Sequence, residues 1–380
     1  VYKRQRLTGE SFRSRVDAAD HSMPALTGLR GLCALWVLLY HAWVYVTPQE
    51  ITFTLFGEVF RFHVALSIGW SGVQILFVLS AFLLTIPFAR HHAGLGARPG
   101  VSKYLVRRIA RVFPAYHAQL LLLLAIALLF ADQWLITLAE LPYYLFMLFM
   151  PEPMGIGSPG RINAVWWTLP IELSFYLLLP LIAWLARWRH RWLLLALSLL
   201  SMAAWRYYAL DVIQPTKRPL WVAQLPGSMD SFGVGMLGAV IHVHYTSLRD
   251  ALSSYRRALL GMLCLTPLAF FGLGHWMAED YTAYWTISPI TFLWTPLFNA
   301  AVLVIILNCA VNQRALDNLF GNRVVFYLGT VSYGLYLWHY PIGKWLLQQP
   351  MIADMQGYAF PRLALSMFLF SMLAASLSWF

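Results

Sequence analysis

Apolar runs of about twenty residues recur along the whole chain and restrict the folds open to it. Ten runs lie at 25–46, 64–88, 114–131, 165–185, 192–210, 228–245, 258–275, 288–309, 325–347 and 361–380. A helix needs about 20 mostly apolar residues to cross a bilayer. Only 11% of the 380 residues are charged, against about 25% in a soluble domain. The sequence therefore predicts an all-α, polytopic transmembrane helical bundle with about ten spans.

One further apolar stretch, 134–150, is ambiguous until the charges are considered. If it does not cross, nineteen basic residues fall on one side of the membrane and only four on the other. Basic residues concentrate in cytoplasmic loops. We therefore expect both chain ends to be cytoplasmic and 134–150 to be re-entrant or to lie at the outer surface. This asymmetry explains the net charge of +11 through membrane topology in an inner or plasma membrane, without nucleic acid.

The chain divides into a polar tail at 1–24 and a transmembrane domain at 25–380. The tail lacks the apolar core of a signal peptide, so we interpret it as cytoplasmic. The chain does not begin with Met and ends inside an apolar run, so we expect trimmed ends. No His, Cys and carboxylate cluster has the spacing of metal ligands, and no metal site is expected.

Two ionisable residues lie in the first apolar run, where lipid would be expected to surround them. Arg30 and His41 are eleven residues apart, which is about 16 Å along a helix and close to three turns, so both lie on one face. An ionisable residue inside a span usually faces the bundle interior or a wet cavity. The pair therefore indicates a function inside the membrane.

A second basic pair opens the third run. Arg108 and Arg111 are three residues apart and share a helix face. Two guanidinium groups form a fork suited to phosphate oxygens. The alternative is ordinary anchoring of the helix by cytoplasmic basic residues.

Polar residues also open the fifth run and line the ninth. Trp167 and Glu172 lie near the outer end of the fifth, where Tyr176 is four residues from Glu172 and can bond it. This favours either a wet interfacial carboxylate below an aromatic belt or a structural polar cluster. In the ninth run, Ser332, Tyr336 and His339 share one face. They are either a packed polar seam between helices or substrate-binding residues.

In this order the motifs resemble the acyltransferase 3 family of integral-membrane O-acyltransferases. The resemblance extends from about Pro24 to the end of the chain. It implies that the last helix continues beyond residue 380, and some family members append a periplasmic hydrolase domain. The matching segments are Leu26–Gly31 with His41, Phe77–Leu83, Arg108 with Arg111, Trp167–Leu177, Met229–Gly235 and Ser332–Pro341.

The resemblance implies transfer of an acyl group, often acetyl, from cytosolic acyl-CoA to a hydroxyl of an extracytoplasmic or lipid-linked glycan. Acyl-CoA would be a co-substrate, with no tightly bound cofactor. Arg108 and Arg111 would hold its phosphates. His41 would be the general base, since an imidazole pKa near 6.5 suits proton transfer. Arg30 and Glu172 complete the candidate catalytic set, with Glu172 expected near the depth of His41.

Two other classes of function fit buried charges without this order of motifs. A transporter or flippase would use Arg30 and His41 as a permeation path and would show flux without acyl-CoA turnover. A structural membrane protein would tolerate neutral substitutions at both positions. The motif order favours the acyltransferase.

Overall fold

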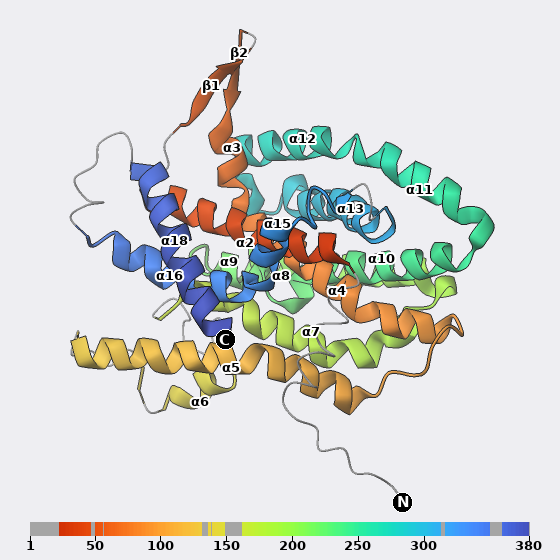
Figure 1. Ribbon diagram of the computed structural model, residues 1–380, viewed down its shortest axis with the longest axis horizontal. Coiled ribbons are helices and arrows are strands. Elements are labelled where there is room, and N and C mark those ends of the chain that lie inside the picture. The colour runs from red at the N-terminus through yellow and green to blue at the C-terminus, as the bar shows by residue number, and fades with distance from the viewer. Residues whose placement is uncertain are drawn as a thin grey trace, which may run out of the picture.

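The computed structural model describes residues 23–46, 50–55, 57–130, 136–137, 139–148, 162–312, 316–349 and 359–379. The cytoplasmic tail predicted at 1–24 lies almost wholly outside these residues. Helices dominate the described part, and a short antiparallel hairpin projects from the bundle at the top of Figure 1. The predicted all-α helical bundle is confirmed.

The first half of the bundle starts with one long helix followed by the hairpin and two further long helices. Its elements are α2 (Pro24–Tyr45), β1 (Thr52–Leu55), β2 (Glu58–Arg61), α3 (Phe62–Ser67), η1 (Gly69–Ser71), α4 (Gly72–His92), α5 (Val101–Phe130), α6 (Leu141–Leu145), η3 (Ala164–Trp167), α7 (Thr168–Ile182) and η4 (Ala183–Leu185).

The second half consists of helices joined by short turns. Its elements are η5 (Trp188–His190), α8 (Arg191–Val212), α9 (Arg218–Val222), η6 (Leu225–Ser228), α10 (Met229–Ser247), α11 (Arg249–Leu263), α12 (Thr266–Glu279), η7 (Ala283–Trp285), α13 (Pro289–Val311), α15 (Arg323–Thr330), α16 (Ser332–Leu346) and α18 (Ala359–Trp379).

Eight helical segments among the described residues are long and apolar enough to cross a membrane, and each coincides with one of the ten predicted spans. The other two predicted spans are also helical. The run 228–245 is α10, and 325–347 is divided at Val331 into α15 and α16. The chain is a multi-pass membrane protein, and the count of ten spans stays a prediction.

The ambiguous stretch 134–150 contains only the five-residue helix α6 in its described part, which is too short to cross. The carbonyls of Tyr144 and Leu145 accept hydrogen bonds from Tyr116 and His117 in the middle of α5. Tyr116 precedes Phe130, the end of α5, by about 21 Å of helix. Figure 1 shows α6 lying against α5. This position favours the re-entrant alternative.

Close helix contacts in the interior depend on glycine. A Cβ on Gly235 of α10 would lie 2.3 Å from the carbonyl oxygen of Val78 in α4. A Cβ on Gly31 of α2 would lie 2.5 Å from the backbone nitrogen of Gly329 in α15. Real atoms do not approach so closely, so any side chain would push these helices apart. The contacts fix α2 and α4, which carry site residues, against the rest of the bundle.

An ion pair is fully buried between α8 and α10. Arg206 and Asp230 are 2% and 0% exposed, with 3.5 Å between nitrogen and oxygen. The guanidinium also donates to the Gly227 carbonyl at 3.1 Å, the Thr291 carbonyl at 2.8 Å and the Thr295 hydroxyl at 2.7 Å. A buried charge is tolerated when it is paired and its hydrogen bonds are satisfied. The pair ties α8, α10 and α13 together.

Candidate active site

His41 and His339 lie in contact, although 298 positions separate them. His41 is near the end of α2, and the fully buried His339 is in the middle of α16. Nδ1 of His41 is 3.2 Å from Nε2 of His339, and the ring centroids are 5.0 Å apart. The two predicted site residues therefore form one unit.

The hydrogen bonds assign the tautomers of this pair. Nδ1 of His41 faces the Val37 carbonyl at 2.9 Å, and Nδ1 of His339 faces the Leu335 carbonyl at 3.3 Å. A carbonyl only accepts, so in the neutral rings both Nδ1 atoms carry the proton. The single Nδ1 proton of His41 is then shared between the Val37 carbonyl and Nε2 of His339. Among the described residues no hydrogen bond occupies Nε2 of His41, so its lone pair is available as a base.

Tyrosines surround the His41 ring. Tyr40 and Tyr340 make edge contacts with ring centroids 5.1 and 5.6 Å away, and Tyr45 lies at 6.2 Å. Tyr40 and Tyr45 are on α2, and Tyr340 follows His339 in α16, so the same helix contact creates both the histidine pair and its aromatic wall. These rings fix the orientation of the imidazole and reduce its access to water.

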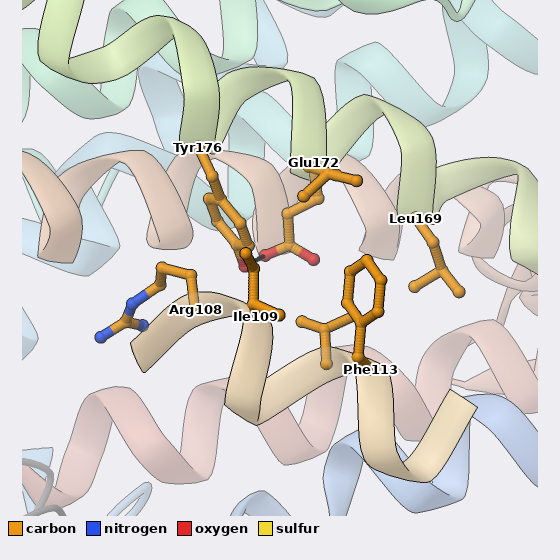
Figure 2. Close-up of a pocket in the computed structure, with 8 residues that line it drawn as sticks. Arg108, Ile109, Phe113, Leu169, Glu172 and Tyr176 are labelled. Carbon is orange, nitrogen blue, oxygen red and sulfur yellow. Dashed lines mark hydrogen bonds between the residues drawn. The ribbon is translucent and has the colours of Figure 1, made fainter. Parts of the chain in front are cut away.

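The basic pair lies at another position, where Arg108 lines a narrow cleft between α5 and α7. Arg108, Ile109, Val112 and Phe113 line one side, and Leu169, Glu172, Leu173 and Tyr176 line the other. Figure 2 shows the α5 and α7 side chains converging on this space. Arg108 is half-buried, and Arg111, one turn further, is exposed.

Glu172 is held in this cleft by two hydroxyl groups. Its Oε1 accepts from Tyr176 at 2.5 Å and from Ser80 of α4 at 2.9 Å. The predicted bond between Glu172 and Tyr176 is present (Figure 2). Their cluster joins α4 and α7 beside Arg108.

The expectation that Glu172 lies at the depth of His41 is wrong. Helices α2 and α4 run antiparallel, because Gly72 packs against Cys33 and Val37 while Gly69 packs against Trp36 and Tyr40. Ser80, the partner of Glu172, is about 12 Å further along α4, toward the end of α2 that carries Arg30. The spacing of the fifth run could not show this, because the chain enters that run from within the bundle.

A line of tyrosines on α16 connects the two positions. Tyr333 donates to the Val112 carbonyl of α5 at 3.0 Å. Tyr336 donates to the Val165 carbonyl at 3.0 Å and lies 3.1 Å from the Thr168 hydroxyl. His339 follows in α16, about 9 Å along the helix from Tyr333, and its ring centroid is 5.7 Å from that of Tyr336. Of the face predicted from Ser332, Tyr336 and His339, the last two therefore lie together, and Tyr333 extends this row of polar side chains, the seam, toward the arginine cleft.

Two predicted site residues lie beside the seam without joining it. Ser332 donates to the Gly329 carbonyl within its own turn at 2.7 Å, which is a local helix contact. Trp167 is half-buried at the start of α7. Its neighbour Trp166 is fully buried and donates from Nε1 to Oε1 of Gln119 at 2.8 Å. An aromatic belt at this end of the run would include both tryptophans, and Trp166 is instead part of the interior.

Sequence analysis missed a hydrogen-bond node built by Gln119 and Asn163. Both amide nitrogens donate to the Leu337 carbonyl, at 2.8 and 2.9 Å. The amide nitrogen of Asn163 also lies 3.2 Å from Oε1 of Gln119. Gln119 is an amide in the apolar run 114–131, two residues after His117, and a polar side chain at such a position is the signal that could have marked it. Within the described part of the chain, no group of His, Cys and carboxylate residues could hold a metal ion.

Comparison with known proteins identifies the family. A family model described as an acyltransferase domain, Acyl_transf_3, matches residues 23–379. The chain belongs to the acyltransferase 3 family. This membership confirms the resemblance, and together with the relatives below it assigns an O-acyltransferase enzyme in place of the transporter and structural alternatives.

Three relatives are similar over most of this chain. A protein of the Acidianus two-tailed virus, provisionally named an acetyltransferase, is 25% identical over 89% of this chain and 87% of its own length. A Bacillus subtilis (strain 168) protein, provisionally named a peptidoglycan O-acetyltransferase, is 26% identical over 84% of this chain and 48% of its own length. The peptidoglycan O-acetyltransferase of Listeria monocytogenes is 24% identical over 84% of this chain and 49% of its own length. The chain thus spans about half of the two bacterial relatives. No solved structure matches the chain.

Proposed function

We propose that this membrane O-acyltransferase takes an acyl group, acetyl in the simplest case, from cytosolic acyl-CoA and transfers it to a hydroxyl of an extracytoplasmic or lipid-linked glycan. The observation that carries the proposal is the seam on α16, which has two arginines at one end and a histidine pair at the other. A phosphate-bearing donor would need basic groups, a hydroxyl acceptor would need a proton acceptor, and the two groups would be needed at separate places. The relatives named as peptidoglycan O-acetyltransferases support a carbohydrate acceptor.

The donor would bind at the arginine cleft. Arg108 and Arg111 provide guanidinium groups, which bind phosphate oxygens in pairs. The cluster of Glu172, Tyr176 and Ser80 lies behind Arg108 and fixes the cleft wall. The positive-inside distribution of charge supports a cytoplasmic location for this end, where acyl-CoA is made. The thioester arm would extend from there along Tyr333 and Tyr336.

The chemistry would occur at Nε2 of His41. It takes the proton of the acceptor hydroxyl as that oxygen attacks the thioester carbonyl carbon. The carbon–sulfur bond then breaks, and the imidazolium returns the proton to the leaving CoA thiolate. Nε2 of His339, which accepts from Nδ1 of His41, stabilises the charged ring and holds its orientation. This is the division of roles between a base and its orienting partner.

Arg30 would serve the donor end. It lies about 16 Å along α2 from His41, too far for one acyl carbon to contact both. Its depth is that of Ser80 and Glu172, as the antiparallel packing of α2 and α4 places it. Of the roles open to Arg30, lining the donor channel fits this position better than binding an oxyanion beside His41.

Single-turnover transfer from radiolabelled acetyl-CoA to membrane acceptor tests the proposal. Membranes with the wild-type chain should acquire label that mild alkali releases, as expected for an O-ester. His41→Gln keeps a hydrogen-bonding side chain but takes no proton at neutral pH. It should lose about 10²–10⁴-fold in rate, with acetyl-CoA binding and monodispersity in detergent retained. Near-normal transfer by this variant would overturn the assignment of the base.

A further inference from the structure

A second and larger hollow lies on the other side of α2 from the histidine pair. It has a volume of about 440 Å³ and lies open between α2, α3, α4 and α12. Ordinary ligand pockets measure about 300–1,000 Å³, so this space is large enough for a substantial ligand. We call it the α12 groove. Its lining is Trp36, Arg61, Phe62, Val64, Ala65, Ile68, Ile75, Phe270, Phe271, Gly274 and His275.

The groove opens within the membrane-spanning part of the bundle. Its walls belong to Pro24–Tyr45, Phe62–His92 and Asp250–Glu279, three of the segments suited to crossing a bilayer. Phe62 and Phe271 are 44% and 56% exposed, so aromatic rings border its mouth. An apolar groove at this position excludes water-soluble ligands and favours hydrocarbon chains.

Gly274 lies at the floor of the groove, where its lack of a side chain leaves the space open. A Cβ there would lie 3.3 Å from a methyl group of Val64 and 3.5 Å from one of Ile68. A larger side chain would therefore project into the space against α3. Two residues earlier on the same helix, a Cβ on Gly272 would meet nothing within 4 Å. These two glycines provide a matched test and control.

A cation lies at the end of this groove. Arg61 is the last residue of β2 and directly precedes α3, so it stands where the chain leaves the hairpin and enters the apolar helix. Its side chain is exposed and lines the groove, and His275 lines it from α12. A guanidinium group above a hydrocarbon groove matches a lipid whose phosphate lies at the edge of its chains.

The groove does not face the site of acyl transfer. Its α2 residue is Trp36, five residues before His41, and five residues turn a helix by 500°, or roughly 140° net. Tyr40 lies between the two faces, against Gly69. His41 packs toward α16, whereas the groove is closed by α12. A bilayer lipid therefore fits this groove better than the acceptor of the transferase.

We propose that the α12 groove binds the acyl chains of a membrane glycerophospholipid, with the lipid phosphate at Arg61. This assignment does not depend on the proposed reaction, because it concerns a separate face of the bundle. The bound lipid would fill the space above Gly274 and hold α12 against α3. The inference names a lipid site in addition to the donor and acceptor sites.

Photocrosslinking of the purified full chain tests this site. The probe is a phosphatidylglycerol carrying a diazirine near the middle of an acyl chain, with labelled peptides identified by mass spectrometry. We expect labelling of the α12 peptide that contains Phe270 and Phe271. Gly274→Phe should reduce that labelling at least tenfold, Gly274→Leu should reduce it less, and Gly272→Phe should leave it unchanged. Equal labelling in Gly274→Phe, checked for folding by its thermal transition, would overturn the proposal.

Competition separates the phosphate contact and the kind of lipid. Unlabelled phosphatidylglycerol should displace the probe more effectively than diacylglycerol, which has the same chains and no phosphate. Arg61→Gln should remove this difference while the chains still bind. Equal competition by diacylglycerol in the wild-type chain would disprove the role of Arg61. Stronger competition by a polyprenyl phosphate than by phosphatidylglycerol would show that the groove serves a lipid carrier, and would overturn the assignment to a bilayer phospholipid.

Discussion

Asn163 donates a hydrogen bond of 2.9 Å from Nδ2 to the carbonyl of Leu337, a residue 174 positions later in the chain. In an uninterrupted helix that carbonyl would accept from the backbone N–H four residues on. That residue is Pro341, which has no N–H. Gln119 provides a second donor at 2.8 Å. The proline therefore allows α16 to be tied to two other elements, two residues before His339.

Asn163→Asp tests the importance of this node for stability. The change preserves shape but turns a donor into an acceptor that faces the Leu337 carbonyl and Oε1 of Gln119. The new carboxyl oxygen has no donor there, and a buried acceptor without a donor costs about 1–3 kcal/mol. We expect a lower thermal transition in detergent and reduced acyl transfer. Asn318→Asp, at an exposed position, should change neither.

A double-mutant cycle identifies the role of the proline. Pro341→Ala restores a backbone N–H that can pair with the Leu337 carbonyl inside α16. The cost of Asn163→Ala should therefore be smaller in a Pro341→Ala background than in the wild type, because the carbonyl has another donor. Contacting residues that share a partner are the ones expected to deviate from additivity. Strictly additive costs would show that Asn163 acts elsewhere.

The spans could be predicted because crossing a bilayer leaves a long apolar run in the sequence. Eight of the ten predicted runs coincide with helices suited to crossing. The weaker signals belong to α10 and to the broken helix α15–α16, which carry polar residues for internal contacts. In these helices the interior is lined by histidine, tyrosine and serine, so composition alone underestimates their role in the bundle.

The helix faces of the candidate site residues were predictable from spacing, but their pairings were not. Spacing placed Tyr336 and His339 on one face, and the structure confirms that face. Residue spacing could not predict the contact between His339 and His41, because that contact depends on the tertiary packing of α16 against α2. It also misplaced Glu172, because the depth at which α7 begins is set by Asn163 and its partners on α5 and α16.

The arginine pair should affect donor binding more than folding. Arg108→Ala with Arg111→Ala should weaken acyl-CoA affinity by at least tenfold, measured by titration of the detergent-solubilised protein. Lysine at both positions should restore only part of the acyl-CoA affinity, since the bidentate geometry of the guanidinium groups is lost. Arg107→Ala removes one charge at the adjacent basic residue, which is not part of the proposed pair, and serves as the control. Unchanged affinity in the double variant would make the pair a topological anchor.

The predicted topology is open to a labelling test at two exposed positions. Leu95 lies between α4 and α5, and Tyr281 follows α12. In a Cys264→Ser background, which removes the exposed native thiol, Tyr281→Cys should react with an impermeant maleimide in intact cells. Leu95→Cys should react only after permeabilisation, because the positive-inside rule predicts that the basic side is cytoplasmic. Labelling of Leu95→Cys in intact cells would show that the orientation is opposite to the predicted one.

The buried pair of Arg206 and Asp230 should be costly to break and cheaper to replace. Asp230→Leu leaves a guanidinium without its counterion, which costs about 3–5 kcal/mol. Replacing both residues with apolar ones, as Arg206→Met with Asp230→Leu, removes the uncompensated charge and should recover part of that loss. Thermal unfolding of each variant measures the difference. A double variant less stable than Asp230→Leu would indicate that the hydrogen bonds of Arg206 to α13 dominate.

His339 should matter for the rate of transfer through its bond to His41. His339→Leu removes the lone pair that accepts from Nδ1 of His41, so the ring loses a fixed orientation and the support of its charged form. We expect a loss of about tenfold to a hundredfold in kcat, less than the roughly 10²–10⁴-fold attributed to a general base, with little change in KM for acyl-CoA. His339→Gln can accept through its amide oxygen and should recover part of the rate. Ser332→Ala, which removes only a bond within its own turn, should stay near the wild-type rate. If His339→Leu and Ser332→Ala transferred equally well, the contact between the histidines would be packing alone.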